Sequence, residues 1–246
     1  MEILWLSFAS TVGWFISSLA GGGSPLILIP AIGVFLGTNA VPPVITTGMM
    51  FGNGQRIWIY WRHINWQLMW WYLPGAVTGS VAGAFLFSRT EIEWLSLLLG
   101  LFLIISVLGY GAGKKQRAFR VKSWYFLPAG FAYSFLSGLI GSSGPLLNPL
   151  YLNYGLVKEE LIATKSVHMI VVHSVKIAAY AAFGAFTGPY FWYGVLIGIA
   201  ALPGNWLGQM VLERISEQRF RQFVMTFVLI SGGLMIWQQR QVLGIG

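Results

Sequence analysis

The sequence contains the stretch Ser17-Ser18-Leu19-Ala20-Gly21-Gly22-Gly23-Ser24-Pro25-Leu26, and a similar stretch follows about 120 residues later: Ser137-Gly138-Leu139-Ile140-Gly141-Ser142-Ser143-Gly144-Pro145-Leu146. Two further matches occur in the same order, Ile45-Thr46-Thr47-Gly48 with Ala163-Thr164-Lys165-Ser166, and Leu73-Pro74-Gly75 with Leu202-Pro203-Gly204. Ordered self-similarity of this kind indicates a duplicated unit. We therefore predict two copies, residues 1–113 and 123–246, joined by a basic linker at 114–122.

The chain around these stretches is strongly apolar. Of its 246 residues, 56% are hydrophobic and 9% are charged, and the mean hydropathy is +0.69. A soluble domain has about 25% charged residues, so this chain lacks the polar surface needed to face water all round. The uncharged run 177–212 exceeds the roughly 20 residues that a helix needs to cross a bilayer. These features predict an all-α polytopic membrane protein whose main partner is the lipid bilayer.

Each copy divides into five apolar segments. They cover 3–20, 25–37, 43–61, 67–87 and 92–112 in the first copy, and 124–140, 145–156, 160–185, 189–212 and 218–238 in the second. The second segment of each copy is short: about 12 residues make a helix of about 18 Å, which cannot span a membrane. It follows a Gly/Ser-Pro break, where glycine permits a turn and proline suits the first position of a helix.

The breaks allow two topologies. If each break merely interrupts one span, the copies have four crossings each and lie parallel. If the chain turns back at each break, the copies are inverted, and about ten basic residues share one side of the membrane (Arg62, five in 114–122, Lys158, Arg214, Arg219, Arg221) against Arg89 and Arg240 on the other. The parallel arrangement splits the charges almost evenly. The positive-inside rule favours inverted repeats in a bacterial inner membrane, with both termini outside, and explains the net charge of +8 without nucleic acid.

The two matched breaks predict a central binding site. Irregular backbone persists in a membrane only where it is buried in protein or lines a cavity. Half-helices beginning at Pro25 and Pro145 would offer N–H groups and positive dipole ends, and serine hydroxyls would add donors. We therefore expect a small anion at the first break (Gly21, Gly22, Gly23, Ser24) and the second (Gly141, Ser142, Ser143, Gly144). The alternative is that these glycines only permit close helix packing.

Basic residues deep in the spans point to the same chemistry. Arg56 and Lys176 lie well inside the third segments, and Lys165 lies one turn into its helix. Asn53 shares a polar stripe with Arg56, and His168 shares a helix face with Lys165 and Lys176. All seven acids are glutamates and none is clearly mid-span, so an anionic ligand would supply the missing charge. Alternatively, Lys165 and Arg56 reach an interface, and carbonyl groups at a helix end satisfy Lys176.

The sequence shows no pattern typical of a metal site or of an enzyme active site. It has no cysteine, which excludes disulfides, thiolate metal sites and cysteine nucleophiles. His168 and His173 would lie about 140° apart on a helix, and no acid is beside them, so we expect no metal or cofactor. A histidine in such a span relays protons or packs through hydrogen bonds. No Ser–His–acid set is evident, which makes a membrane-embedded enzyme the weakest hypothesis.

Several of these motifs recur, in this order, in a known family. They are Gly21-Gly22-Gly23-Ser24-Pro25 with Pro30, Arg62-His63-Ile64-Asn65-Trp66, Leu73-Pro74-Gly75 with Gly79 and Gly83, Gly141-Ser142-Ser143-Gly144-Pro145, and Thr164-Lys165-Ser166 with Tyr180 and Gly184. Over nearly its whole length the chain resembles the sulfite exporter TauE/SafE family of two-repeat bacterial transporters. Ser142-Ser143, Arg56 and Lys176 depart from the family pattern and leave the substrate open.

The resemblance implies transport of a small sulfur-containing anion, such as sulfite or a sulfonate like sulfoacetate. It implies export or uptake by alternating access around the central site. A passive anion channel and a structural membrane subunit remain alternatives from other classes. A homodimer is one assembly that the sequence leaves open.

Overall fold

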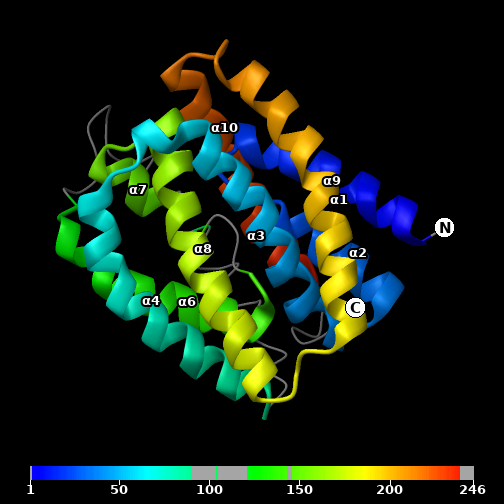
Figure 1. The fold of residues 1–246 in the computed structure, drawn as a ribbon. Coiled ribbons are helices and arrows are strands. Elements are labelled where there is room, and N and C mark those ends of the chain that lie inside the picture. The colour runs from blue at the N-terminus through cyan, green and yellow to red at the C-terminus, as the bar shows by residue number, and fades with distance from the viewer. Residues whose placement is uncertain (1, 90–103, 105–120, 143–145, 239–246) are drawn as a thin grey trace.

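The structure, a computed structural model, describes residues 2–89, 104, 121–142 and 146–238. Every regular element in these ranges is helical (Figure 1), which confirms the predicted all-α class. The helices are α1 (Glu2–Leu19), α2 (Pro25–Leu36), α3 (Val41–Tyr60), α4 (Trp66–Phe87), α6 (Phe126–Ile140), α7 (Asn148–Tyr154), α8 (Lys158–Ala182), α9 (Gly188–Leu212) and α10 (Glu217–Gln238). Apart from residue 104, the predicted segment 92–112 lies outside the described residues, as does the linker 114–122 except for its last two residues.

The surface of the helical bundle is apolar where a soluble protein would be polar. Among the described residues, α1, α8 and α9 are long and apolar enough to cross a membrane. Large side chains on α4 and α9 point outward, with Trp70 71% and Trp192 66% exposed. Exposed apolar surface on this scale calls for a lipid environment. The chain is thus a multi-pass membrane protein.

The short second segments differ in length. In the first copy, α2 begins at Pro25 and covers 12 residues, close to the predicted 25–37. In the second copy, α7 has only 7 residues, Asn148–Tyr154, instead of the predicted 145–156. A turn at 146–147 precedes α7, and Gly155 in the left-handed conformation (φ 116°) ends it. Both segments are too short to span a bilayer as helices.

One group of helices consists of α1, α3 and α9, which run parallel. Along α1, Ser10 donates to the carbonyl of Ile197 (2.6 Å) and Thr11 to that of Ala200 (2.7 Å). Further along, Ser18 on α1 lies beside Arg56 on α3 and Asn205 on α9. Earlier on α3, Gly48 meets Ile197 on α9 and Gly52 meets Trp14 on α1. The residue numbers therefore rise together on all three helices, and their directions agree.

A second group consists of α4, α6 and α8, which also run parallel. Glycines of α4 contact α6 so closely that a Cβ at Gly75 would lie 2.1 Å from Leu127 O, and one at Gly83 would lie 2.2 Å from Phe135 O. Between α4 and α8, Tyr72 stacks on His168 at 4.0 Å, and Phe87 meets Tyr180 further along. Each group therefore contains helices from both copies.

The two groups meet where α3 packs antiparallel to α8. Met50 on α3 contacts Ser174 on α8 (3.8 Å), whereas Arg56, later on α3, shares a cavity wall with Lys165, earlier on α8. Figure 1 shows α4, α6 and α7 on one side of this pair, and α1, α2 and α9 on the other. The centre of the protein is therefore the junction between the third helices of the two copies.

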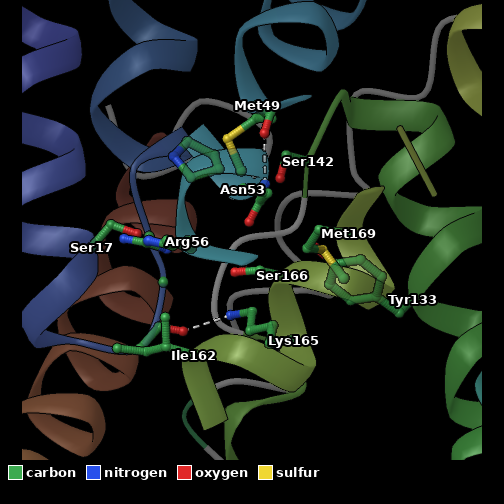
Figure 2. A pocket seen from close by; sticks show the side chains of 14 residues that line it. Ser17, Met49, Asn53, Arg56, Tyr133, Ser142, Ile162, Lys165, Ser166 and Met169 are labelled. Carbon is green, nitrogen blue, oxygen red and sulfur yellow. Dashed lines mark hydrogen bonds between the residues drawn. The ribbon is translucent and has the colours of Figure 1, made fainter. Parts of the chain in front are cut away.

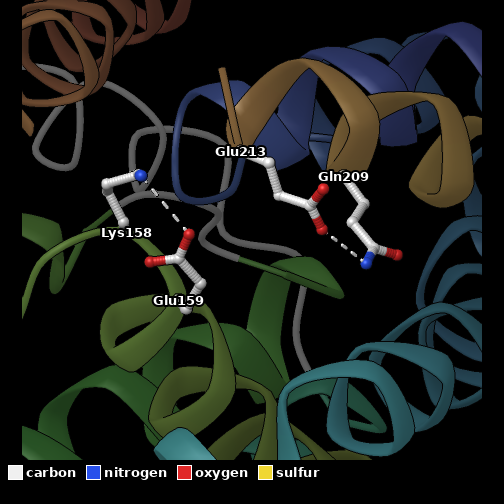
Figure 3. A network of polar contacts seen from close by, with 4 residues as sticks. All are labelled: Lys158, Glu159, Gln209 and Glu213. Atoms are coloured by element: carbon white, nitrogen blue, oxygen red, sulfur yellow. Dashed lines mark hydrogen bonds and ion pairs between the residues drawn. The ribbon is translucent and has the colours of Figure 1, made fainter. Parts of the chain in front are cut away.

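Several connections gather at one end of the bundle. Tyr60, Leu156 and Phe220 belong to one buried cluster, and the backbone N–H of Asn65 donates to Thr164 Oγ1 (2.9 Å). Figure 3 shows two polar contacts here, Lys158 with Glu159 (3.4 Å) and Gln209 with Glu213 (2.9 Å). The end of α3 and the starts of α8 and α10 thus lie at one polar end of the bundle. The basic residues in or beside these helix ends and the neighbouring connections are Arg62, Lys122, Lys158, Arg214, Arg219 and Arg221.

Candidate functional site

A small cavity with charged, polar and apolar lining residues lies between the two glycine breaks, at the junction of α3 and α8 (Figure 2). Its volume is about 20 Å³, enough for about one water molecule. The lining residues come from α1, α2, α3, α6, α8 and both breaks: Ser17, Gly21, Gly22, Gly23, Pro25, Met49, Asn53, Arg56, Tyr133, Ser142, Ile162, Lys165, Ser166 and Met169. Irregular backbone therefore does line a cavity at the centre of this protein.

The first break is a turn that only glycines can form. Gly21, Gly22 and Gly23 have φ angles of 64°, 139° and 115°, a region that side chains disfavour. A Cβ at Gly23 would also lie 1.9 Å from the ring of Phe227. The turn uses its own donors, since the N–H groups of Leu26 and Ile27 bond to the carbonyls of Gly23 (3.0 Å) and Ser24 (3.2 Å). These two N–H groups of α2 are consequently not presented to the cavity, contrary to the expectation from the sequence.

The second break contributes Ser142 to the cavity wall. Gly141 has φ 87°, and Ser142 is 1% exposed. The hydroxyl of Ser142 has no hydrogen-bond partner among the described residues, so it is available to a ligand in the cavity. Ser143 and Gly144 lie outside the described residues. Ser24, of the first break, is not part of the lining: its hydroxyl contacts Met49 Sδ (3.5 Å).

Arg56 lines the cavity and is held only by neutral groups. Its Nε donates to Asn205 Oδ1 (2.8 Å), and its Nη2 donates to Ser18 Oγ (3.0 Å) and Trp14 O (3.4 Å). The guanidinium also lies over the Trp14 ring, 4.6 Å from its centroid. No described carboxylate lies within 4.0 Å of it. Since arginine stays protonated in proteins, Arg56 brings a positive charge that no described acid balances.

Lys165 approaches the cavity from the opposite helix. Its Nζ donates to the carbonyl of Gly21 (2.8 Å) and to Asn148 Oδ1 (2.7 Å). The side chain is only 7% exposed and points inward (Figure 2) rather than toward a membrane interface. Lys165 thus supports the first break and places a second positive charge on the cavity wall.

Lys176 lies outside the cavity lining, although the sequence suggested it as a ligand for the anion. Its Nζ donates to Ser137 O and Ser137 Oγ (both 3.1 Å) and to the carbonyl of Gly141. These oxygens lie at the carboxyl end of α6, where the helix dipole is negative and attracts a cation. The alternative reading, in which a helix end satisfies Lys176, describes this geometry.

Of the two remaining predicted site residues, one lines the cavity and the other does not. Asn53 lines the cavity and donates to Met49 O (2.8 Å). His168 does not line it; its Nδ1 lies 2.6 Å from Tyr151 OH, and its ring stacks on Tyr72. This is the hydrogen-bonded packing role that the sequence left open for a histidine. Among the described residues there is no group of three or more His, Cys, Asp or Glu that could hold a metal.

Sequence reasoning missed several residues of the cavity wall. Ser17 could have been identified from the sequence, because it belongs to the duplicated stretch and aligns with Ser137. Ser166, likewise, follows Lys165 in a matched motif. Tyr133, Ile162, Met49 and Met169 carried no signal, since apolar residues in a membrane helix look alike whether they face lipid, protein or a cavity.

A multi-pass helical bundle with a buried, positively lined cavity beside two breaks in its helices has the architecture of a membrane transporter. The family model "Sulfite exporter TauE/SafE" matches residues 6–235, and the chain belongs to that family. A curated relative, the "Probable inner membrane transporter protein TsaS" of Comamonas testosteroni, is 25% identical over 180 residues, which cover 72% of this chain and 74% of the relative. No solved structure matches. The chain is therefore a membrane transporter and not an enzyme.

Proposed function

We propose that this transporter moves a small sulfur-containing oxyanion or organosulfonate, such as sulfite or sulfoacetate, across the inner membrane. The observation that carries the proposal is the position of Arg56, a buried cation with neutral partners, on the wall of the central cavity. Lys165 shares that wall. A charge inside a membrane is costly, so it marks a ligand pathway.

The lining of the cavity suits an anion that has charged oxygens at one end and a polarisable or apolar group at the other. Arg56, Lys165 and the hydroxyl of Ser142 can donate hydrogen bonds to oxyanion oxygens, and charge-assisted bonds of this kind are the strong ones. Met49 and Met169 supply polarisable thioethers on the same wall. A sulfur lone pair or a short carbon chain would pack against them.

The small size of the cavity supports an alternating-access cycle. A sulfur oxyanion is larger than the single water that fits into about 20 Å³. We propose that the described conformation is closed, and that the breaks with α2 and α7 move apart to admit the anion. In other transporters with repeats, half-helices line the central site, and access alternates as one repeat or bundle moves against the other.

We further propose that the copies are inverted. Equivalent helices (α1 and α6, α3 and α8, α4 and α9) belong to the two oppositely directed groups, which supports this arrangement. At the first break the chain returns beside α1, since a Cβ at Gly13 would lie 3.7 Å from Ile27 Cβ. The basic residues gathered at the polar end favour a cytoplasmic position for that end and for the linker, with both termini outside.

Anion binding and flux test the function directly. Purified protein is screened for thermal stabilisation by sulfite, thiosulfate, sulfonates, sulfate and carboxylates, and the hits are measured as flux into proteoliposomes. We expect stabilisation and saturable flux for sulfur-containing anions, and at least a tenfold rise in KM for Arg56→Gln and Lys165→Met, because each removes a charge from the wall. Accumulation against a gradient would separate a transporter from a channel.

The matched control is Gly54→Ala, a change on α3 where a Cβ meets nothing within 4 Å. It should leave KM unchanged. Equal anion affinity in wild type, Arg56→Gln and Lys165→Met would disprove the proposed site, and the absence of flux for every anion would disprove the proposed function.

A further inference from the structure

Asn205 contacts Arg56 but does not itself line the cavity. It belongs to α9, is 2% exposed and is not a lining residue. It nevertheless makes the shortest contact of the Arg56 guanidinium, 2.8 Å from Nε to Asn205 Oδ1. An asparagine in this position controls the cavity wall through another residue.

The hydrogen bonds of Asn205 determine the orientation of its amide. Its Nδ2 donates to Gly52 O (2.9 Å) and to Gln55 Oε1 (3.0 Å). A backbone carbonyl can only accept, so the NH₂ group must face Gly52 and the carbonyl oxygen must face Arg56. Ser18 Oγ lies 3.2 Å from the same oxygen and 3.1 Å from Trp14 O, and its single proton serves one of them at a time. The amide is thus held by groups of α1 and α3.

The chemical character of Asn205 matters as much as its position. An aspartate has the same shape and would hold the Nε of Arg56 at the same distance, but it would pair with the guanidinium and cancel most of its charge. The neutral amide oxygen of asparagine accepts a hydrogen bond from the guanidinium and does not neutralise its positive charge. The other partners of Arg56 are Ser18 Oγ, Trp14 O and the Trp14 ring, which are neutral as well.

We propose that Asn205 is a positioning residue for anion binding: it fixes the Arg56 guanidinium on the cavity wall while keeping its positive charge available to the substrate. The Nη1 group takes no part in the contacts to Asn205, Ser18 and Trp14 and is the donor left for the anion. The proposal rests on the proposed function, since it assigns Arg56 to the binding of the transported anion.

The decisive variant is Asn205→Asp, measured by flux in proteoliposomes and by thermal unfolding without anion. We expect KM for the transported anion to rise at least tenfold, because a carboxylate at about 3 Å opposes the charge of Arg56. An aspartate cannot donate to Gly52 O or Gln55 Oε1, so the unfolding temperature should fall, and KM is the deciding readout. A merely structural role predicts the lower unfolding temperature with an unchanged KM.

Two comparisons make this test specific. Gln209→Glu is the same amide-to-carboxylate change one turn further along α9, where the side chain contacts Glu213 and not Arg56; it should leave KM unchanged. In an Arg56→Gln background, the neutral change Asn205→Leu should raise KM no further, because its effect acts through the missing guanidinium.

If Asn205→Asp does not yield folded protein, Asn205→Leu replaces it. That change removes the acceptor of Nε but adds no charge, so KM should rise about threefold in wild type and not at all in the Arg56→Gln background. Two results would overturn the role of Asn205 while leaving the proposed function intact, provided that the wild type transports the anion. One is an unchanged KM in the Asn205 variants, and the other is that the effects of the Asn205 and Arg56 changes add. Absence of anion binding in the wild type would instead reject the proposed function.

Discussion

At the scale of single residues, buried cations in this protein have two different surroundings. Lys176 ends among three oxygens at the carboxyl end of α6, where the backbone dipole balances its charge. Arg56 ends among neutral side chains and one carbonyl on a cavity wall. The first arrangement ties the charge to the break beside it, and the second is the basis for the proposal that Arg56 binds the transported anion.

This difference predicts how Lys176→Met behaves. Removing the ammonium leaves the buried carbonyl of Gly141 and the Ser137 oxygens without their donor, which should lower the free energy of unfolding by about 2 kcal/mol. Because Lys176 is not a lining residue, KM should stay within about threefold of wild type. Thermal unfolding and flux, measured beside Arg56→Gln, check this. A large rise in KM with normal stability would contradict this prediction and indicate that Lys176 binds the anion.

At the scale of helices, glycines set how closely the two copies interlock. The fourth helix of each copy packs against the first helix of the other, α4 on α6 and α9 on α1. A Cβ at Gly75 would lie 2.1 Å from Leu127 O, and one at Gly204 would lie 2.1 Å from Thr11 O. These glycines belong to the duplicated Leu-Pro-Gly motifs, so each repeat uses the same residue for the equivalent contact. Small residues let membrane helices approach closely.

Equivalent contacts should respond equally to substitution. Both Gly75→Ala and Gly204→Ala force a methyl group into a carbonyl of the neighbouring helix, and each should lower the unfolding temperature in detergent by a similar amount. Gly233→Ala in α10 is the control, because a Cβ there meets nothing within 4 Å. Two unequal losses, or a loss as large in Gly233→Ala, would contradict the shared role of the motif.

At the scale of the whole molecule, the two oppositely directed groups of helices make a strong prediction about sidedness. Arg62, Lys158 and Arg214 flank helix ends that gather at one end of the bundle, whereas Arg89 follows the opposite end of α4. Under the proposed topology the first three face the cytoplasm and Arg89 faces the outside.

The natural lack of cysteine makes this prediction easy to examine. Single cysteines at positions 62, 158 and 214 should react with a membrane-impermeant maleimide only after the cells are opened, whereas a cysteine at position 89 should react on intact cells. The cysteine-free wild type serves as the background control. Labelling of positions 158 and 214 from opposite sides would rule out the inverted arrangement.

The sequence predicted the helices well because their signals are local. Long apolar runs, prolines at helix starts and glycine breaks each act within a few residues, so α2 begins at Pro25 as expected. The extent of α7 was predicted less well, since Gly155 and the turn before Asn148 shorten it. The cavity was anticipated at the breaks, but its apolar wall was not, because Met49, Met169 and Ile162 carry no local mark of their surroundings.

By itself, then, the duplicated glycine-break sequence determined the membrane class and the family of transporters to which the chain belongs, and it predicts a two-copy organisation. These follow from composition and from motifs that repeat in order. Only the tertiary structure decided which buried cation faces the cavity. Arg56 on α3 and Lys176 on α8 occupy similar depths in equivalent helices. The helical periodicity of the sequence does not distinguish between them. Their roles depend on partners 35 to 149 residues away, which lie beside them only when α6 and α9 of the second copy pack against the centre.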